Sequence, residues 1–471
     1  MKRLLFILAL EISLCTYGQL KPLQQFDSAM QRPVWIFNQT YNLPYLDFLH
    51  GSAFTDGYMY DSVFVVIAPN QWVPDYNSVR ANIIVTMSAN TSKILWYVES
   101  VPQIDKVIMS KYGIICIMPG GIQCYDMLTG ETRWRHSSKD SIVNTSQSPF
   151  TVYHKDSLLY VYCHPVGFSK DSTSFFIINE RTGNIIKSYP GWLPEGANEI
   201  LYVYNNYAIL YNGQGPVCFD LQTDREVWTM GVKTDDWDKN PQTYYYSQVT
   251  DMHFRSDTIY YVEEKHRKVG RTITLNMAQI STGKKIEDIN LPPSANDEFT
   301  NRHNLYRLDK NFIYLFVGKT PEYDYDTLAE HELHVRKLSA HNLMEIWDKG
   351  TGLTYSEKYY RPYAYNKETD TGSIYAFYNK QLAVLSKRDT SVHIKITTDV
   401  LDAYTIKQNS GYLFVVSGDY DKDDNYKVFS KTDITEKPLS DVKMHLLYID
   451  YKANILYLTY HDKMIKVQLP K

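Results

Sequence analysis

The chain has 471 residues, which is beyond the ~250–300 residues at which a single hydrophobic core stops growing, so it requires several domains or a repeated architecture. Its net charge of −4 excludes the strongly basic surface that a nucleic-acid-binding protein needs. Aromatic residues make up 14% of the chain, with 41 Tyr among them, and Tyr favours pleated, half-buried strands. The composition therefore predicts an all-β protein.

The first 18 residues have the pattern of a secretory signal peptide. Lys2 and Arg3 precede the apolar run of residues 4–10, and Gly18 offers a small residue at the cleavage point. Cys15 follows Leu14 rather than a small residue, which argues against lipid attachment. We expect residues 1–18 to be removed and residues 19–471 to form the exported protein, in the periplasm, at the cell surface or in the medium.

No later segment reaches the ~18 consecutive apolar residues of a membrane-spanning helix, so the sequence predicts that the chain is not transmembrane. Export permits disulfides, and Cys116 and Cys124 lie on two successive predicted strands, where they could face each other. The simpler interpretation is two buried thiols.

One phrase recurs along the chain, and its fullest copy combines Asp126, Thr129, Gly130 and Trp134. In each copy an alternating strand enters a turn of the form Asp-x-x-Thr-Gly, and a second strand follows. The other copies contain Trp96; Thr182 and Gly183; Asp220, Thr223 and Trp228; Thr282 and Gly283; and Trp347. Asp bonds to backbone amides in such turns, and Gly, Asn or Asp takes the positive-φ position.

The spacing of these turns predicts β-propeller blades of four antiparallel strands. The turn positions are Ser92, Gly130, Gly183, Asp224, Gly283, Asn342 and Ser391. Their separations fit one blade with variable loops, and a four-stranded sheet must bury its faces against neighbouring sheets. A β-sandwich array would not place Trp on the same strand of each unit.

Up to nine units can be counted, but propellers usually have four to eight blades, so we predict eight, with seven as the alternative. The unit that ends near Pro438 is the one most open to a different interpretation. The last unit has three strands before the chain ends. Residues 33–37, which include Trp35, would supply its fourth strand and close the ring.

The Asp-x-x-Thr-Gly-x-x-x-Trp phrase resembles the PQQ-like repeat of quinoprotein-type β-propellers. Asp126, Thr129, Gly130 and Trp134 match all four positions, whereas Asp224 replaces Gly in the copy around Asp220. The rhythm extends over most of residues 33–471, and two or three blades match strongly. The resemblance implies that Trp96, Trp134, Trp228 and Trp347 dock between adjacent blades.

The resemblance does not imply a quinone cofactor. Quinoprotein dehydrogenases of this family carry two adjacent cysteines and calcium-binding acidic groups, and this chain has no adjacent cysteines. Other members of the family are not enzymes, including an outer-membrane assembly lipoprotein of the β-barrel insertion machinery. We therefore expect no cofactor, and a non-enzymatic branch of the family.

Three tryptophans lie outside the repeat position, among loop-forming residues. They are Trp72, Trp192 and Trp237, and loop aromatics of this kind can stack on sugars or anchor a protein partner. Packing beneath long loops is the alternative. Tyr-rich stretches at residues 244–246 and 359–365 are expected to pack between blades.

Two stretches resemble metal sites only in part. Residues 418–426 contain alternating acids but lack the Gly and the closing Glu of a calcium loop. His331 and His334 lie three residues apart and lack the spacing of a zinc-binding His-Glu-x-x-His helix. We expect a solvated hairpin and an exposed strand entry, and no metal.

The sequence therefore predicts an exported, monomeric propeller that acts as a binding or scaffolding module for an envelope protein or a glycan. The alternative is an enzyme, either a divergent quinoprotein oxidoreductase or a carbohydrate-active propeller. Propeller active sites draw single residues from many blades, so the lack of a catalytic motif is weak evidence against this alternative.

Overall fold

The computed structural model contains strands and turns throughout its described part, and no helix there is long and apolar enough to cross a bilayer. The structure describes residues 33–38, 56–70, 81–102, 104–118, 121–137, 150–163, 174–190, 199–212, 215–231, 244–267, 271–291, 299–308, 311–321, 331–355, 373–378, 381–386, 391–397, 405–408, 412–417, 425–430, 440–443, 445–450, 453, 455–460 and 463–468. Residues 1–18, with the predicted signal peptide, lie outside this part.

The chain divides into two compact units, and each is described by itself. One unit is Tyr58–Tyr360, and the other combines Met1–Gly57 with Arg361–Lys471. The described strands of the first unit form six antiparallel sheets of four strands, each in chain order.

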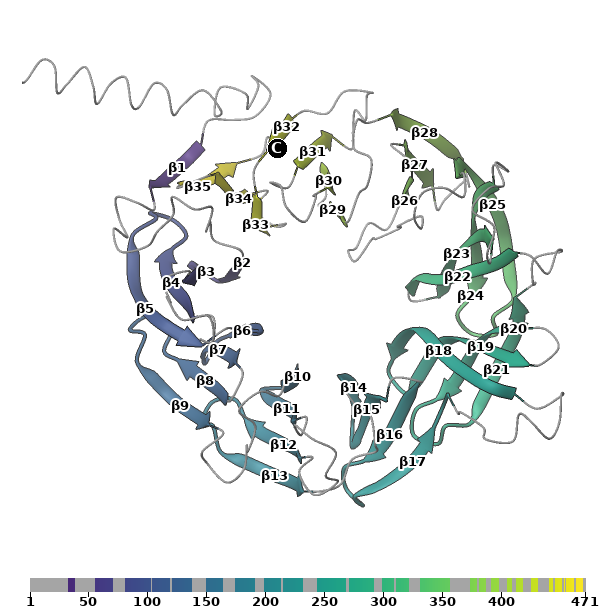
Figure 1. Ribbon diagram of the computed structural model, residues 1–471, viewed down its shortest axis with the longest axis horizontal. Helices are drawn as coiled ribbons and strands as arrows, with labels where there is room; N and C mark the ends of the chain where they lie inside the picture. The colour runs from purple at the N-terminus through teal and green to yellow at the C-terminus, as the bar shows by residue number, and fades with distance from the viewer. Residues whose placement is uncertain are drawn as a thin grey trace, which may run out of the picture. The chain divides into compact units, whose positions relative to one another are not determined.

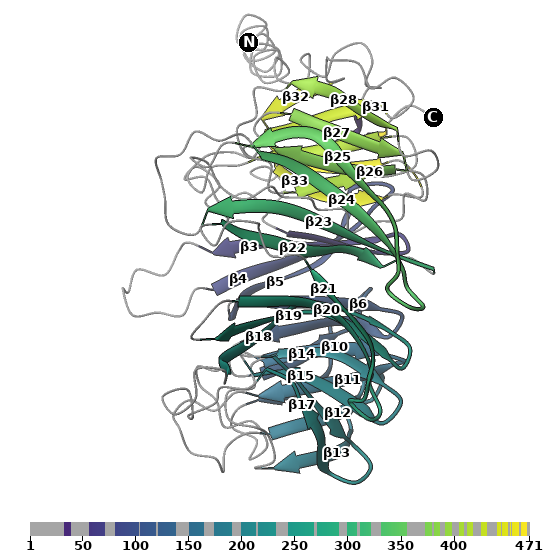
Figure 2. The ribbon, with the colours of Figure 1, turned by 90° about the vertical axis from the view of Figure 1, so that its right-hand side faces the viewer.

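The strands of these six sheets are β2 (Asp56–Tyr60), β3 (Val63–Asn70), β4 (Ala81–Ser88) and β5 (Ile94–Pro102); β6 (Lys106–Ser110), β7 (Gly113–Met118), β8 (Gly121–Tyr125) and β9 (Thr132–Ser137); β10 (Phe150–Lys155), β11 (Leu158–Cys163), β12 (Ser174–Asn179) and β13 (Ile185–Pro190); β14 (Glu199–Tyr204), β15 (Tyr207–Tyr211), β16 (Pro216–Asp220) and β17 (Arg225–Thr229); β18 (Tyr244–Arg255), β19 (Thr258–Arg267), β20 (Arg271–Gln279) and β21 (Lys285–Leu291); and β22 (Phe299–Leu308), β23 (Phe312–Pro321), β24 (His331–Ser339) and β25 (Glu345–Tyr355). We call them the first to the sixth sheet. Figures 1 and 2 show the strands of the third sheet side by side in this order.

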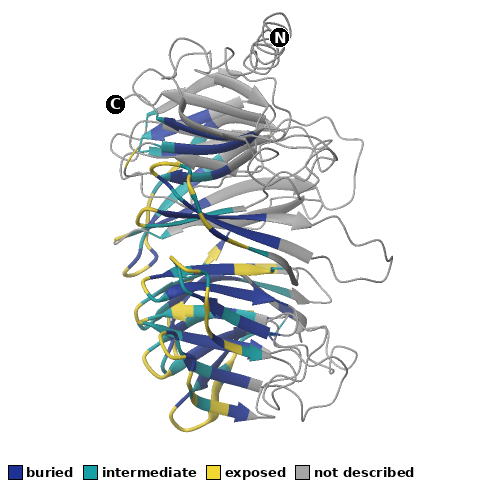
Figure 3. Cartoon of the chain, turned by 90° about the vertical axis from the view of Figure 1, so that its left-hand side faces the viewer, coloured by how far each residue is buried: buried dark blue, intermediate teal, exposed yellow. Residues whose placement is uncertain are grey.

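Each of these sheets packs on the next through apolar side chains. One core cluster joins Val65 of the first sheet to Cys116 of the second, and another joins Ile115 of the second to Phe176 of the third. Three further clusters continue the series to the sixth sheet. Figure 3 shows buried residues along the strands and exposed residues at the turns. Four-stranded sheets stacked face to face in chain order are the blades of a β-propeller.

The second unit contains three sheets in its described part. Its strands are β26 (Ser373–Tyr378), β27 (Gln381–Ser386) and β28 (Val392–Thr397); β29 (Thr405–Gln408), β30 (Tyr412–Ser417), β31 (Asn425–Ser430) and β32 (Ser440–Lys443); and β33 (His445–Asp450), β34 (Ile455–Tyr460) and β35 (Lys463–Gln468) with β1 (Pro33–Asn38). β1 pairs antiparallel with β35, with Trp35 opposite Lys466. The predicted pairing of residues 33–37 with the last strands is therefore confirmed.

The sheet count differs from the predicted number of blades. The described strands form nine sheets, eight with four strands and one with three, whereas the sequence predicted eight blades. The unit ending near Pro438, which the sequence left most open, accounts for the difference because β29–β32 form a sheet of their own.

A β-bulge recurs in the last strand of all six sheets of the first unit. In the second sheet Cys124 pairs with Trp134 and Tyr125 pairs with Thr132, so Arg133 is the extra residue. The equivalent extra residues are Leu95, Ile186, Val227, Ile286 and Ile346. These five are among the large apolar residues that the protein exposes. The bulge explains their exposure because it adds a residue to an edge strand just before the tryptophan position.

The pairing of β1 with β35 generates a test. Deleting residues 1–38 is expected to remove the protection of every second amide of β35 against hydrogen exchange, because these N–H groups lose the carbonyls of β1. Deleting residues 1–32 leaves β1 in place and is the matched control. Unchanged exchange in β35 after the longer deletion would contradict the pairing.

Candidate functional site

The turns between the third and fourth strands of the sheets share one backbone geometry. In the second sheet Asp126 N–H donates to Glu131 O at 2.7 Å, and Gly130 N–H donates to Asp126 O at 3.0 Å. Gly130 has φ +74°, in the left-handed region that glycine enters at no steric cost. The same fifth position of the turn has positive φ in the other five sheets, at Ser92, Gly183, Asp224, Gly283 and Leu343.

The sequence placed this position wrongly in the sixth sheet. It predicted Asn342, but Leu343 has φ +52°, and Leu343 N–H donates to Ser339 O at 2.9 Å. Ser339 N–H donates to Met344 O, so Ser339 is the first residue of this turn and Met344 is the sixth. The positive-φ fifth position therefore falls on Leu343, one residue after Asn342, although Asn is the residue type that favours positive φ. In the second unit Ser386 N–H donates to Ser391 O, which makes Ser391 the sixth residue of its turn rather than the fifth.

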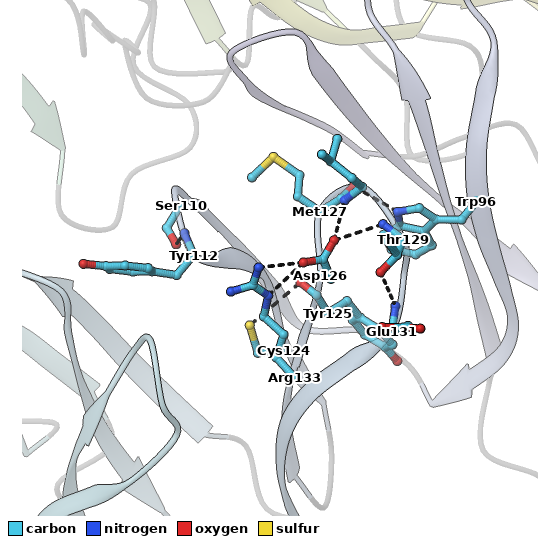
Figure 4. Close-up of polar contacts among 11 residues, drawn as sticks. Trp96, Ser110, Tyr112, Cys124, Tyr125, Asp126, Met127, Thr129, Glu131 and Arg133 are labelled. Carbon is cyan, nitrogen blue, oxygen red and sulfur yellow. Dashed lines mark hydrogen bonds and ion pairs between the residues drawn. The ribbon is translucent and has the colours of Figure 1, made fainter.

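The Asp126 side chain organises its own turn (Figure 4). Its Oδ1 accepts from Leu128 N–H at 2.9 Å and from Thr129 N–H at 3.0 Å, and its Oδ2 accepts from Arg133 Nη2 at 2.6 Å. The Arg133 hydrogen bond and these backbone donors lower the pKa of Asp126 to about 2. Its carboxylate is therefore ionised at neutral pH and fully engaged in the turn.

A tryptophan of the preceding sheet packs on this turn. Trp96 Nε1 donates to Met127 O at 2.9 Å, and a Cβ placed on Gly130 would lie 2.6 Å from Trp96 Cδ2. Only glycine fits under the ring. Trp134 contacts the third sheet in the same way, through Glu180 O and Gly183. Trp228 contacts the fifth sheet through Ile280 O and Gly283.

Two contacts reach the equivalent carbonyl without tryptophan. Tyr189 OH donates to Leu221 O at 2.7 Å between the third and fourth sheets. Tyr260 OH donates to Ala340 O at 2.9 Å between the fifth and sixth sheets, where the buried Leu343 replaces glycine. We call the five acceptors Met127, Glu180, Leu221, Ile280 and Ala340 the docking residues.

The docking residues are also bonded within their own sheets. The N–H groups of Glu180, Leu221, Ile280 and Ala340 donate to carbonyls of the first hairpin, at Ser157, Asn206, Asp257 and Asn311. One residue therefore ties the two hairpins of a sheet together through its N–H group and ties that sheet to the preceding one through its carbonyl.

Glu180 is an exception among the docking residues, because the other four are apolar. Its side chain is 2% exposed, and Oε2 lies 3.1 Å from His154 Nε2. Oε1 has no hydrogen-bond partner among the described residues. A buried carboxylate oxygen without a partner is unfavourable for stability, and no pattern in the sequence predicts that Glu180 is buried.

Half-buried aromatic rings follow one another on the first strands of the third, fourth and fifth sheets. Tyr153 lies edge-on to Tyr202 with ring centroids 6.2 Å apart, and Tyr202 stacks on Phe254 at 4.9 Å. We call Tyr153, Tyr202 and Phe254 the aromatic row. Lys155 Nζ lies 5.8 Å from the Tyr202 ring centroid. Burial raises the pKa of Tyr153 and of Tyr202, so both hydroxyls are protonated at neutral pH.

The three loop tryptophans, Trp72, Trp192 and Trp237, lie outside the described residues. The segments that contain them begin after β3, β13 and β17, which are second or fourth strands of their sheets. Second and fourth strands of an antiparallel sheet run in the same direction, so the chain leaves them at the end opposite the tight turns. The aromatic row was not singled out from the sequence, because its members are single residues on strands far apart in the chain.

The other sequence candidates fall in different places. Residues 418–424 and 359–365 lie outside the described residues, as do the side chains of residues 244–246. His334 lies on strand β24 and pairs with Asp348, with Nδ1 2.9 Å from Oδ1. In the part of the chain that the structure describes, no group of three His, Cys, Asp or Glu side chains is arranged to hold a metal ion.

The cysteines on β7 and β8 face opposite sides of the second sheet. Cys116 packs against the first sheet and Cys124 against the third, and both are free and buried, as is Cys218 on β16. Two thiols on opposite faces of a sheet cannot form a disulfide. Burial raises the pKa of Cys124 and of Cys218 to about 12, so both remain thiols.

Trp134 provides the first test of the docking contact. Trp134→Ala is expected to lower the free energy of unfolding by about 3–5 kcal/mol, because it removes a buried ring and the bond to Glu180 O. Chemical denaturation measures the difference. Ile186→Ala, at an exposed bulge, is the control and should change it by less than about 0.5 kcal/mol. A loss below about 1 kcal/mol for Trp134→Ala would contradict the docking role.

The buried thiols provide a second test. In a Cys15→Ser, Cys163→Ser variant, the three remaining cysteines should not react with an aromatic disulfide reagent in the native state. All three should react after unfolding in denaturant, and absorbance of the released thiol measures both. Rapid reaction of the native protein would show that these side chains are accessible.

Comparison with known proteins gives structural similarity without a family. No family model matches the chain, and no curated protein matches it either. Solved structures similar to it include the Dos1 propeller, at 12% identity and TM-score 0.42, covering 93% of this chain and 95% of that one. A quinohemoprotein alcohol dehydrogenase from Pseudomonas putida HK5 has 9% identity, TM-score 0.41, and coverage of 93% and 76%. The Pan2 WD40 domain of Neurospora crassa has 9% identity, TM-score 0.38, and coverage of 94% and 97%.

Proposed function

We propose that this chain is an exported β-propeller of the PQQ-like type that serves as a binding or scaffolding module in the cell envelope. Its sheets would close into one ring through the pairing of β1 with β35. An envelope protein or a glycan is the proposed partner, and the chain would act as a monomer without a cofactor.

The observation that carries this proposal is the repeated docking contact. The side chains that match the PQQ-like phrase support the fold in this chain: Asp126 holds its turn, Gly130 makes room for a ring, and Trp134 bonds to the next sheet. These residues are therefore committed to fixing one sheet against another. A rigid stack of sheets positions connecting segments for recognition, which is how such scaffolds bind partners.

The aromatic row supports a binding role because tyrosine and other aromatic side chains dominate recognition surfaces. Its tyrosines are half-buried, so the rings are held in place while part of each stays accessible. Further candidate contacts are Trp72, Trp192 and Trp237. They belong to segments that follow β3, β13 and β17, which end on the side of the sheets opposite the tight turns.

Crosslinking of the full exported chain in the envelope, followed by purification, tests the proposal. We expect recovery of a defined protein partner or a glycan-array signal, reduced about tenfold or more by Tyr202→Ala or Trp192→Ala. Tyr97→Ala, an exposed tyrosine on β5 outside the aromatic row, is the matched control and should bind normally. Circular dichroism of each variant separates lost binding from lost folding.

The competing hypothesis is an enzyme, and the same purified protein tests it. A quinone absorbance band that persists after dialysis, or calcium-dependent dye reduction, would overturn the binding-module proposal. Normal partner recovery with both Tyr202→Ala and Trp192→Ala would show that neither aromatic group forms the binding surface.

A further inference from the structure

The contact between the third and fourth sheets replaces both members of the tryptophan–glycine pair. Lys187 pairs with Ile177 across the sheet, as Trp134 pairs with Cys124 in the second sheet. Asp224 occupies the positive-φ position of the turn, with φ +59°. The ring and the glycine beneath it are thus both absent here, and a charged residue stands in each place.

Lys187 shares with Tyr189 the contact that the indole makes elsewhere. Its Nζ donates to Leu221 O, the docking carbonyl of the fourth sheet, and to Asp224 Oδ1 at 2.8 Å. The same ammonium lies 4.5 Å from the centroid of the Tyr189 ring. A Cβ placed on Gly183 would lie 2.5 Å from Trp134 Cγ, so a residue with a Cβ does not fit beneath a tryptophan at this position. The narrower lysine side chain leaves room for Asp224. The two exchanges therefore depend on each other.

The two kinds of contact differ in their exposure to ions. Lys187 and Asp224 side chains are 37% and 51% exposed, whereas Trp96 and Trp134 are 8% exposed. Salt screens exposed charge pairs and leaves buried ring contacts almost unaffected. We propose that the Lys187–Asp224 contact is a salt-responsive joint, at which the turn of the fourth sheet loosens from the third sheet as ionic strength rises.

Hydrogen exchange of equivalent turn amides in the unmodified chain tests this proposal. Asp224 N–H donates to Asp220 O, just as Gly130 N–H donates to Asp126 O and Gly283 N–H to Gln279 O. Between about 0.01 and 1 M sodium chloride, exchange at Asp224 should accelerate about two- to fivefold relative to Gly130 and Gly283. Equal salt dependence at the three amides would overturn the proposal.

Two single variants identify the charges responsible. Lys187→Met or Asp224→Asn should remove the extra salt dependence at residue 224, because each removes the Lys187–Asp224 ion pair. Lys285→Met is the control, since Lys285 forms an exposed ion pair with Asp288 at 3.2 Å on the last strand of the fifth sheet, outside the contact between the third and fourth sheets. Salt dependence that survives Lys187→Met would assign the effect to another group.

A double variant tests whether the two exchanges are coupled. Lys187→Trp combined with Asp224→Gly restores the tryptophan–glycine pair found at the other contacts. In this double variant, hydrogen exchange at residue 224 should show no extra dependence on salt. In Lys187→Trp alone, the N–H of residue 224 should exchange faster than in the unmodified chain, because the indole ring collides with the Cβ of Asp224. Asp224→Gly is the second single variant. If the change in amide protection of the double variant equals the sum of the changes in Lys187→Trp and Asp224→Gly, the two positions are not coupled.

Discussion

The arrangement of the six sheets depends on one backbone carbonyl per turn. A carbonyl at a tight turn cannot be satisfied by the strand ladder, so a donor must come from elsewhere. In this protein the donor comes from the preceding sheet at all five contacts described between the six sheets. The hydrogen bond is directional, so it fixes the position of one sheet on the next, while the apolar clusters beneath it supply most of the burial.

Three chemistries satisfy the same acceptor. An indole N–H, a phenol O–H and a lysine ammonium each reach it, and the residue at the positive-φ position changes with the donor. Glycine accompanies tryptophan, aspartate accompanies Lys187, and Leu343 accompanies Tyr260. The geometry of the acceptor is therefore conserved from sheet to sheet within this chain, although the side chains that meet it are not.

The sequence predicted the local features of the fold well, because hairpins depend on residues close together in the chain. The four-stranded sheets and the turn around Gly130 follow from alternation and turn chemistry. The pairing of residues 33–37 with the last strands is not local, and it was predictable because the last unit lacks a fourth strand. Asn342 is a wrong prediction because Asn favours positive φ by its side chain, whereas the backbone bonds of this turn make Leu343 the fifth residue. The nine sheets exceed the eight predicted blades, because the usual upper limit on propeller size is a property of other propellers and not of this sequence.

The candidate site was less predictable, because its members come from different sheets. Tyr153, Tyr202 and Phe254 are separated by about fifty residues each and meet only through stacking of their strands. Lys187 and Asp224 each occur within ordinary strand and turn sequences, and only their contact shows that they belong together. Glu180 similarly resembles a solvated turn residue until its burial is known.

The bulge before the tryptophan position has a consequence for solubility. Among the described strands of the first unit, the last strand of each of the six sheets pairs on one side only, and it carries aliphatic side chains such as Ile186 and Ile286 toward solvent. A straight edge of this composition would recruit strands from other molecules into a growing intermolecular sheet. The extra residue interrupts the regular spacing of the backbone donors and acceptors and twists the strand, so an incoming strand could pair over only a few residues. The same irregularity that precedes Trp96, Trp134 and Trp228 therefore also limits the pairing of other chains with these edges.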